Sequence, residues 1–229
     1  MTDNNAPPKH LGIILDGNRR WAKSHGLPTL EGHKQGAEVF KEIVLECFNR
    51  EIRFVSAFVF STENWQRTQE EVSYLMRLVL RVVEKYLDEF NERGIKILVL
   101  GSRQGLDEKV IKALDRTIDK TSQNTNGTVA LCFNYGGKTE IIDAIKSVPV
   151  SEINALTPEK FEQYLYSKNL PPLDMIIRTS GEKRLSGFMI WQSEYAELLF
   201  LDKNWPDFSV KDLDNVIEEY KKRKRRHGK

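Results

Sequence analysis

The alternation of short apolar runs with longer helix-like stretches constrains the fold of this chain more than any other feature. The runs are rich in β-branched residues, as strands buried on both faces are, and they cover residues 10–16, 52–60, 95–101, 128–134 and 174–178. The helix-like stretches cover residues 34–50, 68–93, 105–122, 138–147, 157–166 and 209–225. This order predicts an α/β fold with a mainly parallel central sheet and helices on both faces.

The chain length and the composition exclude several classes of protein. We expect the 229 residues to form a single domain, with residues 1–9 as a loose leader. With 40% hydrophobic and 30% charged residues the chain has the composition of a globular protein. A net charge of +2 gives no overall field that would favour nucleic acid or an anionic membrane.

The cysteines, the N-terminus and the apolar runs indicate in which cellular compartment the protein works. Cys47 and Cys132 both lie in apolar segments, so we expect neither a disulfide framework nor a cysteine zinc site. The N-terminus lacks the pattern of a signal peptide, and no apolar run approaches the roughly 20 residues of a membrane span. The sequence therefore predicts a cytoplasmic protein without stable membrane insertion.

One helix-like stretch, residues 72–90, is apolar over far more than one face. Arg77 and Arg81 are the only charged residues in its first three turns. A helix of this kind has to bury a second side. Two interpretations remain open, a deep core or subunit contact, and a wall of a cavity for an apolar ligand.

Polar residues follow each apolar run, at the edge where open parallel sheets bind ligands. Arginines, small hydroxyl side chains and glycines recur there, and they suit phosphate through paired donors and through close backbone approach. Asp16 stands alone among cations after the first run, a pattern that suits Mg²⁺ shared with ligand phosphates. The segments concerned are residues 16–21, 61–67, 101–103, 134–138 and 178–186.

Each of these residues also has an ordinary structural interpretation. Arg19 and Arg20 side by side are typical of a solvated surface pair, and His33 suits a helix cap or a core position. Trp21 and Trp65 suit packing positions equally well. The coincidence of polar residues at several strand ends favours a phosphate or diphosphate ligand over these separate explanations.

Missing motifs disfavour the common alternatives. The chain has neither a GxxxxGK[ST] phosphate loop nor a GxGxxG turn after its first run, and it has no HExxH, no CxxC and no GxSxG. Walker-type nucleotide enzymes, dinucleotide binders, zinc proteases and serine hydrolases are therefore disfavoured.

The motif blocks, taken in order, resemble the cis-prenyltransferases, whose bacterial members include undecaprenyl diphosphate synthase. The blocks span about residues 10–228 and read HLGIILDGNRRWA, GHKQGAE, FVFSTENWQR, NYGGK, IIRTSGEKRLSGFMIWQSEYAE and LLFLDKNWPDF. The resemblance implies an enzyme that condenses isopentenyl diphosphate with an allylic prenyl diphosphate, releases pyrophosphate and leaves each new double bond cis. It also implies Mg²⁺ as cofactor, a homodimer and a hydrophobic tunnel, and no role for nucleic acid.

Carried over by position, the resemblance implies roles for individual residues. Asp16 would hold Mg²⁺ and act in catalysis together with Asn64, and Glu197 would add a metal contact across the dimer. The residues implied to bind the two substrates are Gly17, Asn18, Arg19, Arg20, Trp21, His33, Ser61, Thr62, Glu63, Trp65, Arg67, Arg178, Arg184, Leu185 and Ser186.

Three further expectations depend on the same resemblance. The family uses the Asn64 position as proton acceptor, but a neutral amide is a poor base, so we expect Asn64 to orient the substrate while pyrophosphate oxygen takes the proton. Val59 is a candidate for the tunnel wall. Arg226-His227-Gly228 resembles a C-terminal RxG motif that reaches the partner's diphosphate, although a merely solvated basic tail is the alternative.

Two positions depart from the pattern of many family members. Thr29 stands where a basic residue precedes the GH histidine by four, so the diphosphate clamp is expected to be weaker or to depend on Arg19. Lys138 ends the NYGG block in place of the common arginine.

Two other functions remain as alternatives. A phosphohydrolase of the HAD type would use Asp16 as nucleophile, but such enzymes carry a second Asp two residues later, where this chain has Asn18. A non-catalytic subunit of a heteromeric prenyltransferase would typically lack the DGN aspartate or its neighbours, which this chain keeps.

Overall fold

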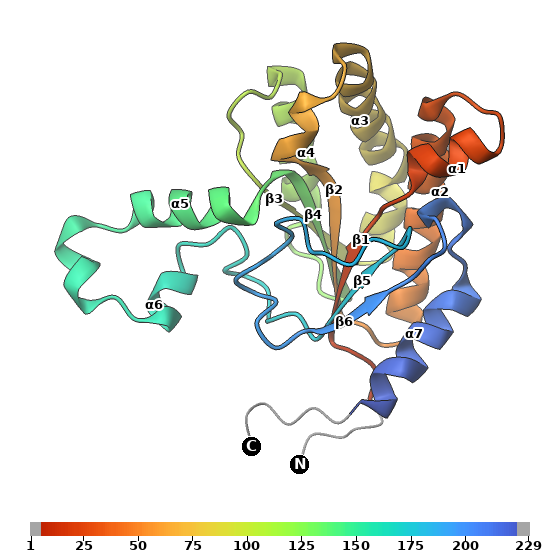
Figure 1. Cartoon of the computed structure of the whole chain (residues 1–229). Coiled ribbons are helices and arrows are strands. Elements are labelled where there is room, and N and C mark those ends of the chain that lie inside the picture. The colour runs from red at the N-terminus through yellow and green to blue at the C-terminus, as the bar shows by residue number, and fades with distance from the viewer. Residues whose placement is uncertain (1–5, 224–229) are drawn as a thin grey trace.

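One parallel sheet organises the fold. The computed structural model describes residues 6–223, and Figure 1 shows the strands side by side in the centre of the molecule. The sheet has six strands in the order β3-β4-β2-β1-β5-β6, and each neighbouring pair is parallel. The strands are β1 (His10–Ile14), β2 (Phe54–Ser61), β3 (Ile95–Leu100), β4 (Gly127–Tyr135), β5 (Met175–Arg178) and β6 (Glu197–Phe200). The α/β fold expected from the alternating pattern is confirmed.

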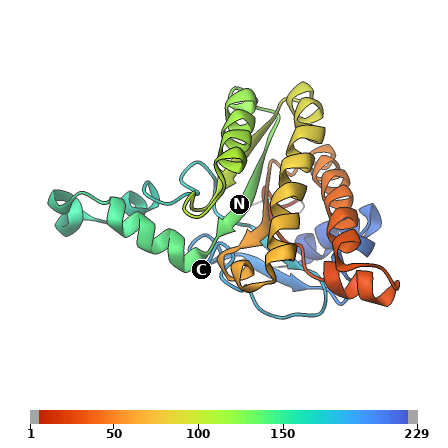
Figure 2. The same cartoon turned by 90° about the horizontal axis from the view of Figure 1, so that it is seen from above.

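The longer helices lie over one face of this sheet. Viewed from above, α2, α3 and α4 run next to one another on the same side (Figure 2). Together with α7 they pack on inward-facing strand residues such as Leu11 and Ile13 of β1. The helices are α1 (Asn18–Ser24), α2 (Thr29–Asn49), α3 (Gln69–Glu92), α4 (Glu108–Thr121), α5 (Gly137–Ser147), α6 (Pro158–Glu162) and α7 (Val210–Lys222).

The opposite face of the sheet is covered largely by irregular chain. Phe188 and Met189 pack there against Ile14 and Ile176. Gly12 of β1 is needed for this contact, because a Cβ at that position would lie only 2.9 Å from the Phe188 ring. The α5–α6 segment projects away from the body of the molecule in both ribbon views (Figures 1 and 2).

Several elements differ from the sequence-based boundaries. β6 was not anticipated, because it is a four-residue, partly exposed edge strand and shows no buried apolar run. The predicted helix-like stretches do not include α1, which has Ala22 as its one buried residue. α2 begins at Thr29 instead of residue 34, and α6 ends at Glu162 instead of residue 166. Within residues 6–223 no helix has the length and apolarity that crossing a bilayer requires.

His10 is a buried junction at the amino end of the sheet. Its Nδ1 lies 2.8 Å from the Pro171 carbonyl oxygen, so Nδ1 carries the proton, and Nε2 accepts the Ser56 hydroxyl at 2.7 Å. The Asp174 carboxylate accepts the His10 backbone N–H at 2.8 Å. Burial is the largest cause that lowers the pKa of the imidazole from 6.5 to about 4.

This geometry predicts that the free energy of unfolding depends on pH through His10. The folded protein keeps the ring neutral, whereas the unfolded chain protonates it near pH 6.5, so stability is lost as the pH falls from about 6.5 towards about 4. The loss reaches about 3 kcal/mol, because one pKa unit corresponds to about 1.4 kcal/mol. Urea unfolding followed across this range measures it.

The matched variant is His10→Asn, which keeps an amide donor and acceptor but has no titrating group. Its stability should be lower at pH 7 and should fall less steeply below pH 6.5. Equal slopes for the two proteins would show that His10 does not carry the pH dependence.

Candidate active site

The central feature of the candidate site is an ion pair between Asp16 and Arg178. Ile14 of β1 lies opposite Arg178 of β5 in the sheet, so Asp16 emerges beside the arginine where both strands end. Arg178 Nη2 donates to Asp16 Oδ2 at 2.7 Å, and the Gly17 backbone N–H donates to Oδ1 at 2.8 Å. The Arg178 side chain is only 5% exposed and the Asp16 side chain 32% exposed. The carboxylate is therefore held in one orientation with one side open.

Arg178 also organises the loop that follows β5. Its Nη1 donates to the Arg184 carbonyl oxygen at 2.6 Å and to the Ser186 hydroxyl at 2.8 Å. Its Nε is buried and has no hydrogen-bond partner within residues 6–223. A buried guanidinium held in one position presents paired donors that suit phosphate oxygens.

Arg20 joins α1 to the same loop from the other side. Its Nη1 donates to the Ser180 carbonyl oxygen at 2.5 Å and to the Ser180 hydroxyl at 2.6 Å. Glu182 accepts hydrogen bonds from both Arg20 and Arg184. These bonds lower the pKa of the Glu182 carboxyl, and the bond from Arg20 has the larger effect. Glu182 thus holds two arginines at the rim as their common counter-ion.

A second cluster, of two arginines and a histidine, surrounds Glu71 near the start of α3. Its buried Oε1 accepts from Arg67 Nη1 at 2.9 Å and lies 3.3 Å from His33 Nε2. Arg19 Nε is 4.0 Å from the same oxygen. Burial first, and then the charge of Arg67, lower the pKa of His33. Glu71 therefore draws Arg67, Arg19 and His33 from three different elements to one place.

The short 3₁₀ turn η1 (Thr62–Gln66) forms another part of the rim. The Ser61 backbone N–H donates to Asn64 Oδ1 at 3.1 Å, and the Ser61 side chain accepts the Asn64 N–H in return. This capping box uses the amide oxygen of Asn64 to hold the turn. The Nδ2 group, which has no hydrogen-bond partner within residues 6–223, is then the part of Asn64 that is available to a ligand.

A large apolar cavity opens behind this rim. Its volume is about 720 Å³, and it is lined at the mouth by Asp16, Asn64 and Arg178. The deeper walls are apolar and include Phe40, Val59, Leu75, Leu78, Val79, Val82, Val83, Leu87, Phe90, Ile97, Val129 and Leu131. The second apolar side of α3 is thereby explained as a cavity wall, and Val59 is confirmed as a wall residue.

Not all of the sequence-predicted site residues line the cavity. Those that do are Asp16, Asn18, His33, Ser61, Thr62, Glu63, Asn64, Arg67, Arg178 and Ser186. Those outside its lining are Gly17, Arg19, Arg20, Trp21, Trp65, Arg184, Leu185 and Glu197. Most of the second group lie on the rim, bonded to residues of the first group or adjacent to them in the chain.

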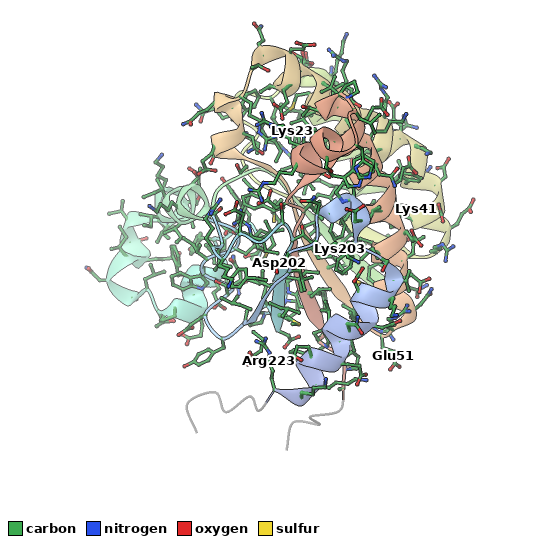
Figure 3. All side chains as sticks on the ribbon, turned by 45° about the vertical axis from the view of Figure 1, so that its right-hand side comes forward. Lys23, Lys41, Glu51, Asp202, Lys203 and Arg223 are labelled. Carbon is green, nitrogen blue, oxygen red and sulfur yellow. The ribbon has the colours of Figure 1, made fainter. Side chains whose placement is uncertain are left out.

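The side chains of Glu197, Trp21 and Trp65 are bonded to residues outside the cavity lining. Glu197 pairs with Met175 at the amino end of the sheet, three residues or about 10 Å of strand from the rim. It binds Arg223, which Figure 3 shows at the foot of α7, away from Asp202 and Lys203 after β6. Trp21 donates to Asp207 at 2.6 Å, and Trp65 to Asn134 at 2.7 Å. The motif at residues 226–228 lies outside the described residues.

Sequence reasoning missed the two carboxylates that hold the arginines. Glu71 follows Arg67 by four residues at a helix start, and this spacing, which pairs charges on a helix, was its available signal. Glu182 had no such signal, since only the fold brings Arg20 to it. Lys138 lines the cavity mouth in the first turn of α5, whereas Thr29 is simply the first residue of α2.

The donor atoms at the mouth fit a hard cation such as Mg²⁺. Asp16 offers a partly exposed carboxylate. The Oδ1 atom of Asn18, which has no hydrogen-bond partner in the described part of the chain, is buried against Gly36 of α2. No cluster of three His, Cys, Asp or Glu side chains that would suit a metal occurs within residues 6–223. Mg²⁺ does not need one, because it is commonly held by one or two carboxylates, waters and substrate phosphates.

Comparison with known proteins gives consistent matches over nearly the full length. A family model described as putative undecaprenyl diphosphate synthase matches residues 14–228. The isoprenyl transferase of Thermotoga maritima is 45% identical over 225 residues, which cover 96% of this chain and 97% of that protein. The isoprenyl transferase of Clostridium acetobutylicum is 44% identical, with 96% and 90% covered.

Solved structures match as well. Lavandulyl diphosphate synthase from Lavandula x intermedia, in complex with dimethylallyl diphosphate, superposes with a TM-score of 0.93 at 29% identity, covering 97% of this chain and 99% of that one. A probable undecaprenyl diphosphate synthase from Campylobacter jejuni has a TM-score of 0.81 at 29% identity, with the same coverage.

The rim geometry predicts that inorganic pyrophosphate binds to the protein and that Arg178 is required. Arg178→Gln should weaken binding about tenfold or more, because a hydrogen bond to a charged group contributes roughly 1.5–3 kcal/mol. Titration calorimetry at fixed ionic strength measures the affinity.

Arg93→Gln is the control, since it removes an equal charge from an exposed arginine that pairs only with Glu89 among the described residues. Its affinity should match that of the parent. If the two variants weakened binding equally, net charge rather than the rim would account for the effect.

Proposed function

Since this chain belongs to the undecaprenyl diphosphate synthase family of isoprenyl transferases and performs cis-prenyl chain elongation, we propose how its own residues divide that reaction. The substrates are isopentenyl diphosphate and an allylic prenyl diphosphate, and the products are a longer polyprenyl diphosphate and pyrophosphate. The observation that carries the proposal is the cluster of cationic and hydroxyl side chains around Asp16 at the mouth of an apolar cavity. Because the chain belongs to this family, a phosphohydrolase of the HAD type is excluded as an alternative function.

The side of the rim that contains Asp16 binds the allylic diphosphate. Asn18 and Arg19 begin α1, whose first backbone N–H groups have no side-chain cap and are available to an anion. Arg67 and His33 supply further donors from the Glu71 cluster. Mg²⁺, when held by Asp16 and the diphosphate, would withdraw charge from the departing pyrophosphate.

Bond breaking places new negative charge on the leaving group, and the rim is arranged to receive it. The allylic C–O bond breaks, the new C–C bond forms to isopentenyl diphosphate, and one proton leaves the condensing unit. Donors fixed before the reaction stabilise the charge that develops more than they stabilise the ground state. Arg67 is held by Glu71 in this way and is not free to rearrange.

The opposite side of the rim holds isopentenyl diphosphate. Arg178 and Ser186 line the cavity there, and Arg184 is tied to them through its carbonyl oxygen. Arg20 and Glu182 hold the same loop in place from outside. This arrangement supports binding of the two diphosphates on either side of the Asp16–Arg178 pair.

Asn64 orients the condensing substrate rather than removing its proton. Asn64 lines the cavity, and its Oδ1 atom is already engaged by the Ser61 N–H, so that its Nδ2 group is the part left for substrate. Pyrophosphate oxygen is the stronger base and is generated at the same place. An Asn64→Asp enzyme that outpaced the parent across pH would overturn this assignment.

The apolar cavity takes up the growing chain and excludes water from the allylic cation. Its walls come from α2, α3 and the strands β2, β3 and β4. No charged group apart from Lys41, which pairs with Glu89, lies among the deeper lining residues of the described chain. An intermediate with cationic character therefore finds its counter-charge at the rim, and the side chains around the rest of it are hydrocarbon.

We further propose that two copies of the chain associate through the projecting segment α5–α6 and the edge strand β6. Ile142 and Ile145, one helical turn apart on α5, are 49% and 52% exposed, and Val150 is 86% exposed. Leu198 on β6 is also exposed. An exposed apolar helix face and an unpaired strand edge are each typical of an interface. Glu197, on this edge, would then serve the partner's site.

Asp16 is expected to be essential to turnover and not to folding. Asp16→Ala should lower kcat by orders of magnitude, because it removes the only carboxylate at the mouth that pairs with Arg178 in the described chain. Release of pyrophosphate with labelled isopentenyl diphosphate and an allylic primer measures the rate, and circular dichroism monitors the fold.

Asp174→Ala is a matched control, since Asp174 is also a strand-end carboxylate that accepts a backbone N–H, but at the amino end of the sheet. It should lower stability and leave kcat nearly unchanged. Near-normal turnover of Asp16→Ala would remove Asp16 from the mechanism.

The proposed interface predicts that Ile145→Glu disrupts the dimer. A buried carboxylate without a partner costs several kcal/mol, enough to dissociate an interface of ordinary affinity. Sedimentation velocity measures the oligomeric state. Leu27→Glu, a substitution at a 42% exposed leucine between α1 and α2, should leave it unchanged. A dimeric Ile145→Glu protein would place the interface elsewhere.

A further inference from the structure

Trp65 lies in the turn η1, but its side chain is not among those that line the cavity. Its indole Nε1 donates to Asn134 Oδ1 at 2.7 Å. Its ring meets Phe60 edge-on, with centroids 5.3 Å apart and an angle of 81° between the planes. Trp65 is therefore attached to the end of β4 and to β2, away from the space that substrate would occupy.

Asn134 is a buried residue whose amide uses both of its N–H donors and its oxygen in hydrogen bonds. Besides accepting from Trp65, its Nδ2 donates to the Ser102 carbonyl oxygen at 2.8 Å and to the Gln104 carbonyl oxygen at 3.0 Å. The residue is only 3% exposed. It joins three separate segments: η1, the end of β4 and the loop that follows β3.

A bulge in the sheet makes this arrangement possible. Phe60 lies opposite Phe133 and Ser61 lies opposite Tyr135, so Asn134 is the extra residue between them. Its φ of +50° is left-handed, a conformation that asparagine tolerates better than most residues. Bulges re-aim a side chain at the edge of a sheet, and here the re-aimed side chain is the Asn134 amide.

The connection ends at the residues that face the substrate. Trp65 directly follows Asn64, whose amide caps the turn by accepting from Ser61. The capping box lies within the turn, and Arg67 is bonded to Glu71 of α3. Among the described residues, the side-chain hydrogen bond that attaches the turn to the sheet is the one from the Trp65 indole. A displacement of Trp65 would therefore move Asn64 relative to the rim.

We propose that Trp65 and Asn134 act as a pair of positioning residues: the Asn134 amide at the β4 bulge holds the Trp65 indole, and so sets the place of Asn64, without either residue contacting substrate. The proposal deepens the proposed function, because it assumes that the turn at residues 61–67 takes part in catalysis. A misplacement of about 1 Å in a reacting geometry can cost a hundredfold in rate.

A double-mutant cycle tests the pair. Asn134→Gly removes the amide while tolerating the left-handed backbone, and Trp65→Phe removes the indole donor. Each should lower kcat by about tenfold to a hundredfold and leave KM for both diphosphates little changed. The double variant should be no slower than the slower single variant, because each substitution breaks the same connection.

Asn124→Gly is the matched control for a loss of stability alone. Its Nδ2 also bridges two segments, at the amino end of the sheet, by donating to Asn91 and to the Ile95 carbonyl oxygen. It should lower the unfolding midpoint and leave kcat unchanged. A comparable fall in kcat for Asn124→Gly would reduce the Asn134 effect to general destabilisation and overturn the proposal.

Other outcomes separate this inference from the function on which it depends. A rise in KM for Trp65→Phe, with effects that multiply in the double variant, would make Trp65 a substrate contact and overturn the pairing. If the Asn64→Ala enzyme turned over substrate at the normal rate, the proposed catalytic role of the turn at residues 61–67 would be overturned. Loss of turnover in Asn64→Ala together with independent effects of Asn134→Gly and Trp65→Phe would overturn the inference alone.

Discussion

The ion pair between Asp16 and Arg178 is the contact on which the rest of the site depends. It joins two neighbouring strands at their carboxyl ends. Arg178 also donates hydrogen bonds to Arg184 and Ser186 in the loop that follows β5. Because Arg178 is buried, its charge is screened less by solvent than that of a surface arginine. The pair therefore fixes one negative and one positive charge at the mouth of the cavity. Glu71 and Glu182 hold further arginines, among them Arg67 and Arg20, around this mouth.

The second determinant is the sharp boundary between that polar mouth and the apolar cavity. α3 has apolar residues on two sides, so that Val72 and Leu80 pack with Leu114 of α4 while Leu78 and Val82 line the cavity. A reaction that separates a diphosphate anion from an allylic cation needs this boundary, because the anion requires fixed donors and the cation requires the absence of water. The fold places both environments within one pocket.

The two ends of the sheet carry different tasks. The carboxyl ends contribute Asp16, Asn64 and Arg178, which line the cavity and to which we assign the binding and reacting roles proposed above. The amino ends contribute His10 with Ser56 and Asp174, which close the sheet with buried hydrogen bonds. Glu197 belongs by position to this second end, and that is why its proposed role depends on another copy of the chain.

The sequence by itself determined the fold class, most strand and helix positions and the strand-end residues of the site, since hydrophobic periodicity and turn chemistry are local properties. The motif blocks likewise sufficed for the family, which the comparisons confirm. Only the tertiary structure decided which side chains face the cavity. Trp65 turns away from it because a bulge places Asn134 within reach, and Glu182 meets Arg20 although 162 residues separate them. Strand order, register and such long-range contacts arise from packing of the whole chain, and no local pattern encodes them.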